Sequence, residues 1–340
     1  MSTQASLLEA PKETQRGEIS TAPVFSRDRF HTEPRKNDFV TDKNYFFGFK
    51  RRTPGQRTPP AELIADYVYD PVYDRHMRGF VCGENLMLIG PPGSGKTQLG
   101  IYLAHHMGLA FYPLAMYAHT QGEDLLGKPA QNDEGLWRFV PAPLVQAYEH
   151  GGLVLLDEFP ALKPGVAMLL HPFLNRDPVI IQTDTGERTI YPHDDFRAIA
   201  TGNHWSRFAG NYEIGEALGD RMTFVHASFL PAESEISLLC DIAPNVQPGV
   251  ITDLVSFAQT VRAGVEASPD TNRYCPSTRV LRKLVSKMEI TGHTLDEAVE
   301  DCIIQKLREL YRDEYKAVLK VLKGHVALEN WDKYAAEVAD

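Results

Sequence analysis

The chain has 340 residues, of which 43% are hydrophobic and 24% charged, so it can bury the core of one large domain or two medium ones. Its formal net charge of −10 argues against a protein that coats nucleic acid, because phosphate binding needs a concentrated basic surface. Four widely spaced cysteines without a C-x-x-C pair fit a reducing compartment and do not suggest a zinc site. We find neither the pattern of a secretory leader nor an apolar run of ~20 residues, and therefore expect a cytoplasmic protein without a membrane span.

Residues 1–60 are rich in Thr, Pro, Lys, Arg and Glu, with 11 basic against 7 acidic residues, and predict an extended or disordered arm. The aromatic run Tyr45–Phe49, followed by Lys50, Arg51 and Arg52, interrupts this arm. Two interpretations are open: the aromatic rings pack on the surface of the adjoining domain, or they dock a neighbouring subunit or partner.

From Ala61 the pattern becomes helical, with Leu63, Ile64, Tyr67 and Val68 on one face. A second helix is expected from Lys96 to His106. Short apolar runs that favour buried strands follow one another at 85–90, 109–116, 153–156, 196–201 and 223–229. Strands that alternate with helices predict a parallel sheet covered on both faces.

Two further patterns complete the predicted elements. Residues 179–191 form two β-branched runs around a Thr-Gly turn, which predicts a β-hairpin. After Pro231 only helices are expected, over 233–242, 250–267, 277–291 and 295–322.

The segment between the first strand and the helix at 96–106 matches the pattern G-x-x-x-x-G-K-[ST]. Its glycines let the loop wrap phosphates with backbone amides, while Lys96 reaches the β- and γ-phosphates and Thr97 offers a hydroxyl to Mg²⁺. The helix that begins here adds its dipole. The sequence therefore predicts a site for ATP and Mg²⁺ in a loop comprising Gly90, Pro91, Pro92, Gly93, Ser94, Gly95, Lys96 and Thr97, with Gln98 following it.

The strand at 153–156 ends in two carboxylates, Asp157 and Glu158. Parallel strands end at one edge of the sheet, so both carboxylates are expected beside the phosphate loop. Asp157 would hold Mg²⁺ and Glu158 would orient and polarise the attacking water. Without the loop upstream, an ordinary acidic strand end would be the better interpretation.

Three more side chains are candidates, each with a simpler structural alternative. Asn203 either hydrogen-bonds the γ-phosphate or the attacking water, or forms an ordinary strand-end turn. Arg221 either stabilises charge on the γ-phosphate of a neighbouring subunit or forms a surface salt bridge. Arg279 either reports the nucleotide state to the helical segment or lies at a solvated helix start.

In chain order these motifs resemble the Walker A, Walker B, sensor 1, arginine finger and sensor 2 motifs of AAA+ ATPases. The resemblance covers about residues 61–325 and implies an α/β fold whose five-stranded parallel sheet has the order 5-1-4-3-2, followed by a small all-α lid domain. The implied organisation is an arm at 1–60, a nucleotide-binding domain at 61–230, a lid at 231–325 and a C-terminal tail at 326–340.

Two segments narrow the resemblance to the MoxR branch of the superfamily. Residues 122–127 with 139–144 resemble its helix-2 insert, and the hairpin at 179–191 resembles the hairpin before sensor 1. The stretch 140–222 is most similar to the cobaltochelatase ATPase subunit (CobS-like, of the dynein-related AAA type) and its relatives. His204-Trp205 after Asn203, and Met222 after Arg221, depart from the common pattern of that group.

The resemblance implies a Mg²⁺-dependent ATPase that works as a ring, expected to be hexameric, with each ATP held between subunits. It also implies a partner with a von Willebrand A domain or another remodelled target, and hence a chaperone-like activator or a chelatase motor subunit. The alternative is a nucleic-acid-dependent motor of the helicase or restriction type, supported by the aromatic-basic segment 45–52 and by Arg188. Metal chemistry by the chain itself is not expected, because His105 and His106 cannot face one ion from adjacent helical positions.

Overall fold

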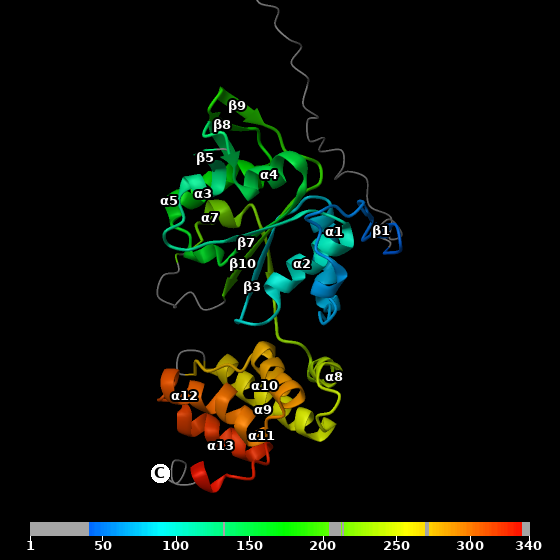
Figure 1. The fold of residues 1–340 in the computed structure, drawn as a ribbon, viewed down its shortest axis with the longest axis vertical. Coiled ribbons are helices and arrows are strands. Elements are labelled where there is room, and N and C mark those ends of the chain that lie inside the picture. Colours follow the sequence, from blue (N-terminus) through cyan, green and yellow to red (C-terminus); the bar gives the residue numbers. More distant parts are fainter. Residues whose placement is uncertain (1–40, 132, 204–211, 213, 269–271, 335–340) are drawn as a thin grey trace, which may run out of the picture. The chain divides into compact units, whose positions relative to one another are not determined.

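The computed structural model describes residues 41–131, 133–203, 212, 214–268 and 272–334. Its elements form an α/β region (residues 45–226) and a helical region (residues 232–334), shown in Figure 1. None of the helices within these described segments is both long and apolar enough to cross a bilayer.

A five-stranded parallel sheet forms the centre of the α/β region. Its strands are β3 (Leu86–Gly90), β4 (Phe111–Ala115), β7 (Gly152–Asp157), β10 (Phe196–Asn203) and β11 (Thr223–His226). They lie in the order β11-β3-β10-β7-β4, which is 5-1-4-3-2 in chain order. The predicted fold and strand order are therefore confirmed.

Alternation along the strands builds a separate apolar core on each face of the sheet. Leu153 and Leu155 of β7 pack on one face with residues of α1 (Asp74–Val81) and α2 (Lys96–Met107). Val154 and Leu156 pack on the other face with residues of α4 (Pro143–His150) and α6 (His171–Asn175). A strand buried on both faces reads as a continuous apolar run, which is why β7 was recognisable from sequence.

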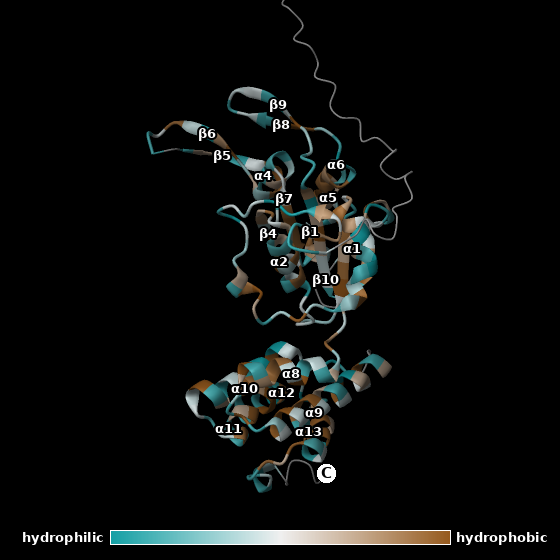
Figure 2. Cartoon of the chain, turned by 90° about the vertical axis from the view of Figure 1, so that its right-hand side faces the viewer, coloured by the Kyte–Doolittle hydropathy of each residue, from teal (hydrophilic) through white to brown (hydrophobic). Residues whose placement is uncertain are grey.

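Two β-hairpins extend from the same end of the α/β region (Figures 1 and 2). One follows α3 (Gly122–Leu126) and pairs β5 (Gly127–Gln131) with β6 (Trp137–Pro141); the other pairs β8 (Val179–Thr183) with β9 (Gly186–Ile190). The second is the hairpin predicted at 179–191. Both contact α4, and each exposes a large apolar side chain, Trp137 at 62% and Ile180 at 63%.

Residues 41–60 differ from the extended or disordered arm predicted for 1–60; residues 1–40 of that arm lie outside the described part. Strands β1 (Tyr45–Phe46) and β2 (Phe49–Lys50) pair as a short hairpin, with Phe46 and Phe49 buried in the core beside α2. Arg52 donates two hydrogen bonds to the Asp195 carboxylate, at 2.6 and 2.7 Å. The aromatic rings thus pack on the adjoining domain, as in the first of the two interpretations, because that core offers them an apolar surface.

The helix predicted from Ala61 is wrong. Only one 3₁₀ turn forms, η2 (Ala61–Leu63), and Leu63 is 56% exposed. Pro71 disfavours a helical conformation for Asp70, which instead starts the next 3₁₀ turn, η3 (Pro71–Tyr73), by accepting a hydrogen bond from the Val72 N–H at 2.9 Å. The first α-helix begins at Asp74.

The helical region contains α8 (Ala232–Ile242), α9 (Pro248–Ala267), α10 (Thr278–Thr291), α11 (Leu295–Val299), the π turn η6 (Glu300–Ile304), α12 (Gln305–Leu310) and α13 (Tyr315–His325). The single helix predicted over 295–322 is wrong, because the chain leaves the helical conformation at Tyr311. The Glu314 carboxylate beyond this break accepts hydrogen bonds from the N–H groups of Arg273 and Tyr274, both at 2.8 Å. The break lets α13 pack against α9.

The predicted C-terminal tail at 326–340 also differs from the structure over its described part. Val326, Leu328 and Tyr334 are buried in the core of the helical region. These apolar side chains extend that core beyond α13. Residues 335–340 of the tail lie outside the described residues.

We predict that Phe46→Ala lowers the free energy of unfolding by about 3 kcal/mol, because it removes a buried ring that joins the N-terminal hairpin to α2. Tyr45→Ala, in the same strand but 41% exposed, is the matched control and should change stability by less than about 1 kcal/mol. Urea unfolding measures both. Equal effects of the two substitutions would show that the hairpin is not part of the folded core.

Candidate functional site

The loop between β3 and α2 approaches its neighbours closely at its glycines. Gly93 and Gly95 have φ values of 79° and 85°, in the left-handed region that side chains disfavour. A Cβ at Gly90 would lie 2.0 Å from the Ala227 carbonyl oxygen. The backbone therefore curls as the G-x-x-x-x-G-K-[ST] motif requires, and α2 begins at Lys96.

The Lys96 ammonium is enclosed at the centre of the site, with the residue only 8% exposed. It donates to the carbonyls of Gly90 and Pro91, both at 2.9 Å, and to Asn203 Oδ1 at 3.2 Å. Burial lowers the pKa of Lys96 to about 8, although the Glu158 and Asp157 carboxylates oppose this shift. The nearby positive charge of Arg279 lowers the pKa further.

Asp157 ends β7 beside the first turn of α2. Its carboxylate accepts from Thr97 Oγ1 at 3.2 and 3.4 Å and from the Thr201 hydroxyl in a short hydrogen bond. The predicted magnesium ligands Thr97 and Asp157 are therefore adjacent. Hydroxyl and carboxylate oxygens are the ligands that Mg²⁺ accepts, and Mg²⁺ completes its shell with substrate phosphates and water.

Glu158 follows in a left-handed conformation, with φ 56° and ψ 40°, which is unfavourable for a residue with a side chain. Its N–H donates to Thr201 Oγ1 at 3.1 Å, and its carboxylate accepts from the Asn203 amide at 3.2 and 3.3 Å. This conformation turns the exposed carboxylate away from the strand direction and toward Asn203.

Thr201 is a site residue that sequence reasoning missed. It is 1% exposed and contacts both acidic residues, through its hydroxyl to Asp157 and through the Glu158 N–H. The available signal was a hydroxyl directly after the apolar run 198–200, because a buried hydroxyl at a strand end needs a polar partner.

The two candidate arginines lie in different places. Arg279 lies in the first turn of α10 near the phosphate loop, with its Cβ 3.9 Å from where a Cβ of Gly93 would stand. Arg221 precedes β11; its guanidinium donates to Asn175 Oδ1 at 2.7 Å and, in a short bond, to the Ala217 carbonyl. Among the described residues, no hydrogen bond or ion pair joins Arg221 to the phosphate loop.

The residues of the phosphate loop and of the neighbouring strand ends fit a nucleoside triphosphate with Mg²⁺. The Ser94 Oγ atom of the loop is buried without a hydrogen-bond partner in the described structure, and its hydroxyl could donate to a phosphate oxygen. Pro92 and Gln98 are exposed at the same loop. The described residues hold no cluster of three His, Cys, Asp or Glu side chains suited to a metal.

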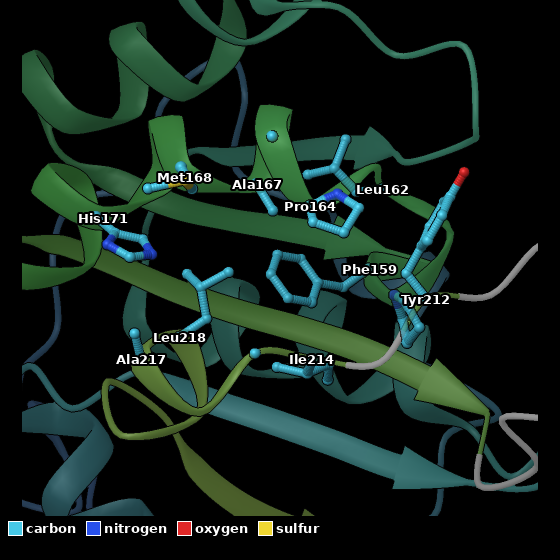
Figure 3. A pocket seen from close by; sticks show the side chains of 13 residues that line it. Phe159, Leu162, Pro164, Ala167, Met168, His171, Tyr212, Ile214, Ala217 and Leu218 are labelled. Carbon is cyan, nitrogen blue, oxygen red and sulfur yellow. The ribbon is translucent and has the colours of Figure 1, made fainter.

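Two cavities have linings that include none of the phosphate-loop residues. One of about 390 Å³ is lined by residues 65–68, including Tyr67, and by residues of α8. The other, of about 260 Å³, is mainly apolar and lies between the turn η4 (Phe159–Ala161), which follows Glu158, and α7 (Glu216–Gly219), which precedes Arg221. Figure 3 shows Phe159, Leu162 and Leu218 around it. Its apolar lining does not suit phosphate.

Comparison with known protein families gives a match that contains most of these motifs. The family model described as the AAA domain (dynein-related subfamily) matches residues 85–222. This match makes residues 85–222 similar to an AAA domain of the dynein-related subfamily. The matched range begins one residue before β3 and includes Lys96, Asp157, Glu158, Asn203 and Arg221, but not Arg279.

The individual relatives share less than 30% sequence identity with this chain. An uncharacterized protein of Staphylococcus epidermidis is 25% identical over 249 residues, which cover 72% of this chain and 91% of that protein. Midasin of Dictyostelium discoideum is 29% identical over 155 residues, 46% of this chain and 3% of midasin. The solved structure of a proposed ATPase from Cytophaga hutchinsonii is 18% identical in sequence and aligns with a TM-score of 0.42. The alignment covers 76% of this chain and 92% of that protein's chain.

We predict that binding of MgATP takes up protons at alkaline pH. In the free protein the Lys96 ammonium loses its proton as the pH rises through about 8, whereas bound phosphate favours the charged form and raises its pKa. Calorimetry in buffers of different ionisation enthalpy should detect proton uptake at pH 8.5 and little from this group at pH 6.5. In Lys96→Arg, whose guanidinium stays charged, the uptake at pH 8.5 should disappear; uptake that persists would assign it to another group.

Proposed function

We propose that this chain hydrolyses ATP with Mg²⁺ as part of a ring of identical subunits and uses the energy to remodel a partner protein. The observation that carries the first part is the continuous network from Lys96 through Asn203 to Glu158, beside the Thr97–Asp157 pair. The network supports the proposal because it brings the Lys96 ammonium, the Asn203 amide and the acidic side chains together at one edge of the sheet, the groups that phosphoryl transfer from ATP needs.

Each residue of the network has a distinct role in this proposal. Lys96 and the loop amides bind the β- and γ-phosphates, and Thr97 and Asp157 hold Mg²⁺, which neutralises charge on the phosphates. Glu158 accepts a hydrogen bond from the attacking water and so orients and polarises it. Asn203 fixes the Glu158 carboxylate and donates toward the γ-phosphate. Thr201 holds both acidic residues in register.

The position of Arg221 supports a shared site. Thr223, two residues after Arg221, pairs with Leu86 at the start of β3, whereas the phosphate loop follows Gly90 at its end. Four residue steps along a strand span about 13 Å, which is longer than an arginine side chain. Arg221 therefore serves the nucleotide of a neighbouring subunit, and the functional unit is a ring, which we propose to be hexameric.

The second part of the proposal concerns the partner. The two hairpins expose Trp137 and Ile180 at one end of the α/β region, which suits contact with protein. With the resemblance to the MoxR branch, this favours a chaperone-like activator or chelatase motor subunit, of the cobaltochelatase type, that works with a von Willebrand A protein or another target in the cytoplasm.

The arginines that favoured a nucleic-acid motor form hydrogen bonds and ion pairs with other residues of the chain. Arg51 donates to the His106 carbonyl at 2.8 Å, and Arg52 is paired with Asp195. Arg188 of the β8–β9 hairpin forms an ion pair with Glu149 of α4. These arginines have internal partners for their charge, so the protein-remodelling function is the better supported of the two.

We predict that Glu158→Gln lowers kcat for ATP hydrolysis by at least about 100-fold and leaves the affinity for MgATP within a few-fold, because the amide cannot act as the base. Glu309→Gln, an exposed change in α12, is the control and should behave as wild type. Steady-state phosphate release and equilibrium nucleotide binding measure the two effects. Turnover that survives in Glu158→Gln would remove Glu158 from this role.

We predict that two inactive variants complement each other when mixed. Lys96→Ala disables the phosphate loop and Arg221→Ala the residue supplied to the neighbour, so a mixed ring contains some sites with both groups intact. Random equal mixing should restore about a quarter of the wild-type rate per subunit. As the control, Lys96→Ala mixed with Glu158→Gln should recover nothing, because both groups belong to the same half of the site. An absence of recovery in the first mixture, with mixed rings demonstrated, would contradict a shared site.

A further inference from the structure

A buried ion pair lies in the helical region and is not part of the phosphate loop. Glu235 of α8 is 0% exposed and Arg262 of α9 is 3% exposed. The guanidinium meets the carboxylate through two parallel hydrogen bonds, Nη1 to Oε2 at 2.7 Å and Nη2 to Oε1 at 2.9 Å. Neither residue belongs to a nucleotide-binding motif.

The pair holds the chain where it enters α10. Arg262 Nε donates to the Pro276 carbonyl at 2.8 Å, and the Thr278 hydroxyl donates to Glu235 Oε1 at 2.6 Å. Between these two attachments lies Ser277, whose Cβ is 2.6 Å from where a Cβ of Gly93 would stand. Arg279 comes directly after Thr278, so the pair fixes the turn that carries Arg279 against the phosphate loop.

The same arginine contacts the segment that joins the two regions. This segment runs from the end of β11 at His226 to the start of α8 at Ala232. The Arg262 guanidinium carbon lies 4.1 Å from the centroid of the Phe229 ring, and Gln259, one turn earlier on α9, donates to the Leu230 carbonyl at 3.4 Å. One buried group thus joins the connecting segment, α8, α9 and the first turn of α10.

Stability alone does not call for an ion pair at this place. Replacing a buried ion pair with apolar side chains of similar volume is often neutral or stabilising. An apolar pair would fill the space but could not bind the Pro276 carbonyl, the Thr278 hydroxyl and the Phe229 ring in one fixed arrangement. The polar pair therefore fixes the position of the turn at the start of α10, and Arg279 is the next residue of that turn.

We propose that Glu235 and Arg262 are positioning residues for ATP turnover, which lock the turn bearing Arg279 to the segment connecting the two regions. This inference rests on the proposed ATPase function and on the role of Arg279 in it. The pair touches no substrate and acts only through Arg279. When the helical region moves, Arg279 moves with it relative to the phosphate loop.

The test is a double-mutant cycle in the full chain, between Arg279→Ala and the paired apolar change Glu235→Leu with Arg262→Met, which leaves no unpaired buried charge. We expect the paired change to keep the cooperative thermal transition and to lower kcat about as much as Arg279→Ala does, on the order of 10-fold. In the Arg279→Ala background it should lower kcat no further. Equal falls in both backgrounds, or no fall in either, would overturn the proposal.

A second substitution tests the link if the paired change prevents folding. Thr278→Val removes only the hydroxyl that joins Glu235 to α10 and should lower kcat several-fold, again only while Arg279 is present. Thr252→Val on α9, whose hydroxyl bonds the Pro248 carbonyl of its own helix, is the matched control. A Thr278→Val variant with wild-type kcat contradicts the proposal.

The same data separate this inference from the function on which it rests. A wild type without Mg²⁺-dependent turnover overturns both. An active wild type that Arg279→Ala leaves unchanged overturns the role of Arg279 and, with it, the positioning role of the pair. An active wild type that depends on Arg279 but not on the pair overturns the pair alone.

Discussion

The site depends on the pairing of β10 between β3 and β7. Parallel pairing sets Asn203 opposite Gly90 on one side and Ala200 opposite Leu156 on the other, so the ends of three strands meet at one edge. The Lys96–Asn203–Glu158 and Thr97–Asp157–Thr201 contacts all span neighbouring strands or the helix that follows one. A slip of one residue in either pairing would turn these side chains to the opposite face and disperse the site.

The rest of the α/β region stabilises two site residues, Lys96 and Glu158, whose burial or backbone conformation is unfavourable by itself. The ammonium of Lys96 is buried, which lowers its pKa to about 8, and two backbone carbonyls and an amide oxygen partly replace its lost hydration. Glu158 holds a left-handed conformation of the kind that persists only where surrounding structure determines it. Here the buried strands on both sides, with apolar cores on both faces, provide that constraint.

The sequence was informative where local chemistry and tertiary structure agree. The five strands are apolar runs buried on both faces, and the phosphate loop needs glycines at fixed places, so both were predictable. The helix predicted from Ala61 is wrong because apolar periodicity carries no information on the turn that Asp70 and Pro71 start. The unbroken helix predicted over 295–322 is wrong because periodicity cannot show that Glu314 accepts a hydrogen bond from a backbone N–H distant in sequence. The packing of Phe46, the place of Thr201 in the site and the Glu235–Arg262 pair depend on partners far along the chain, which no local pattern specifies.

The central claim is that one chain provides only half of a working site, because Arg221 lies at the opposite edge of the sheet from its own phosphate loop. The most direct measurement is the ATPase rate per subunit as a function of protein concentration, with the assembly state followed by sedimentation under the same conditions. The account predicts that the rate per subunit rises with the fraction of protein in rings and is negligible for the monomer. A monomer that turns over ATP at the rate of the assembled protein would contradict it.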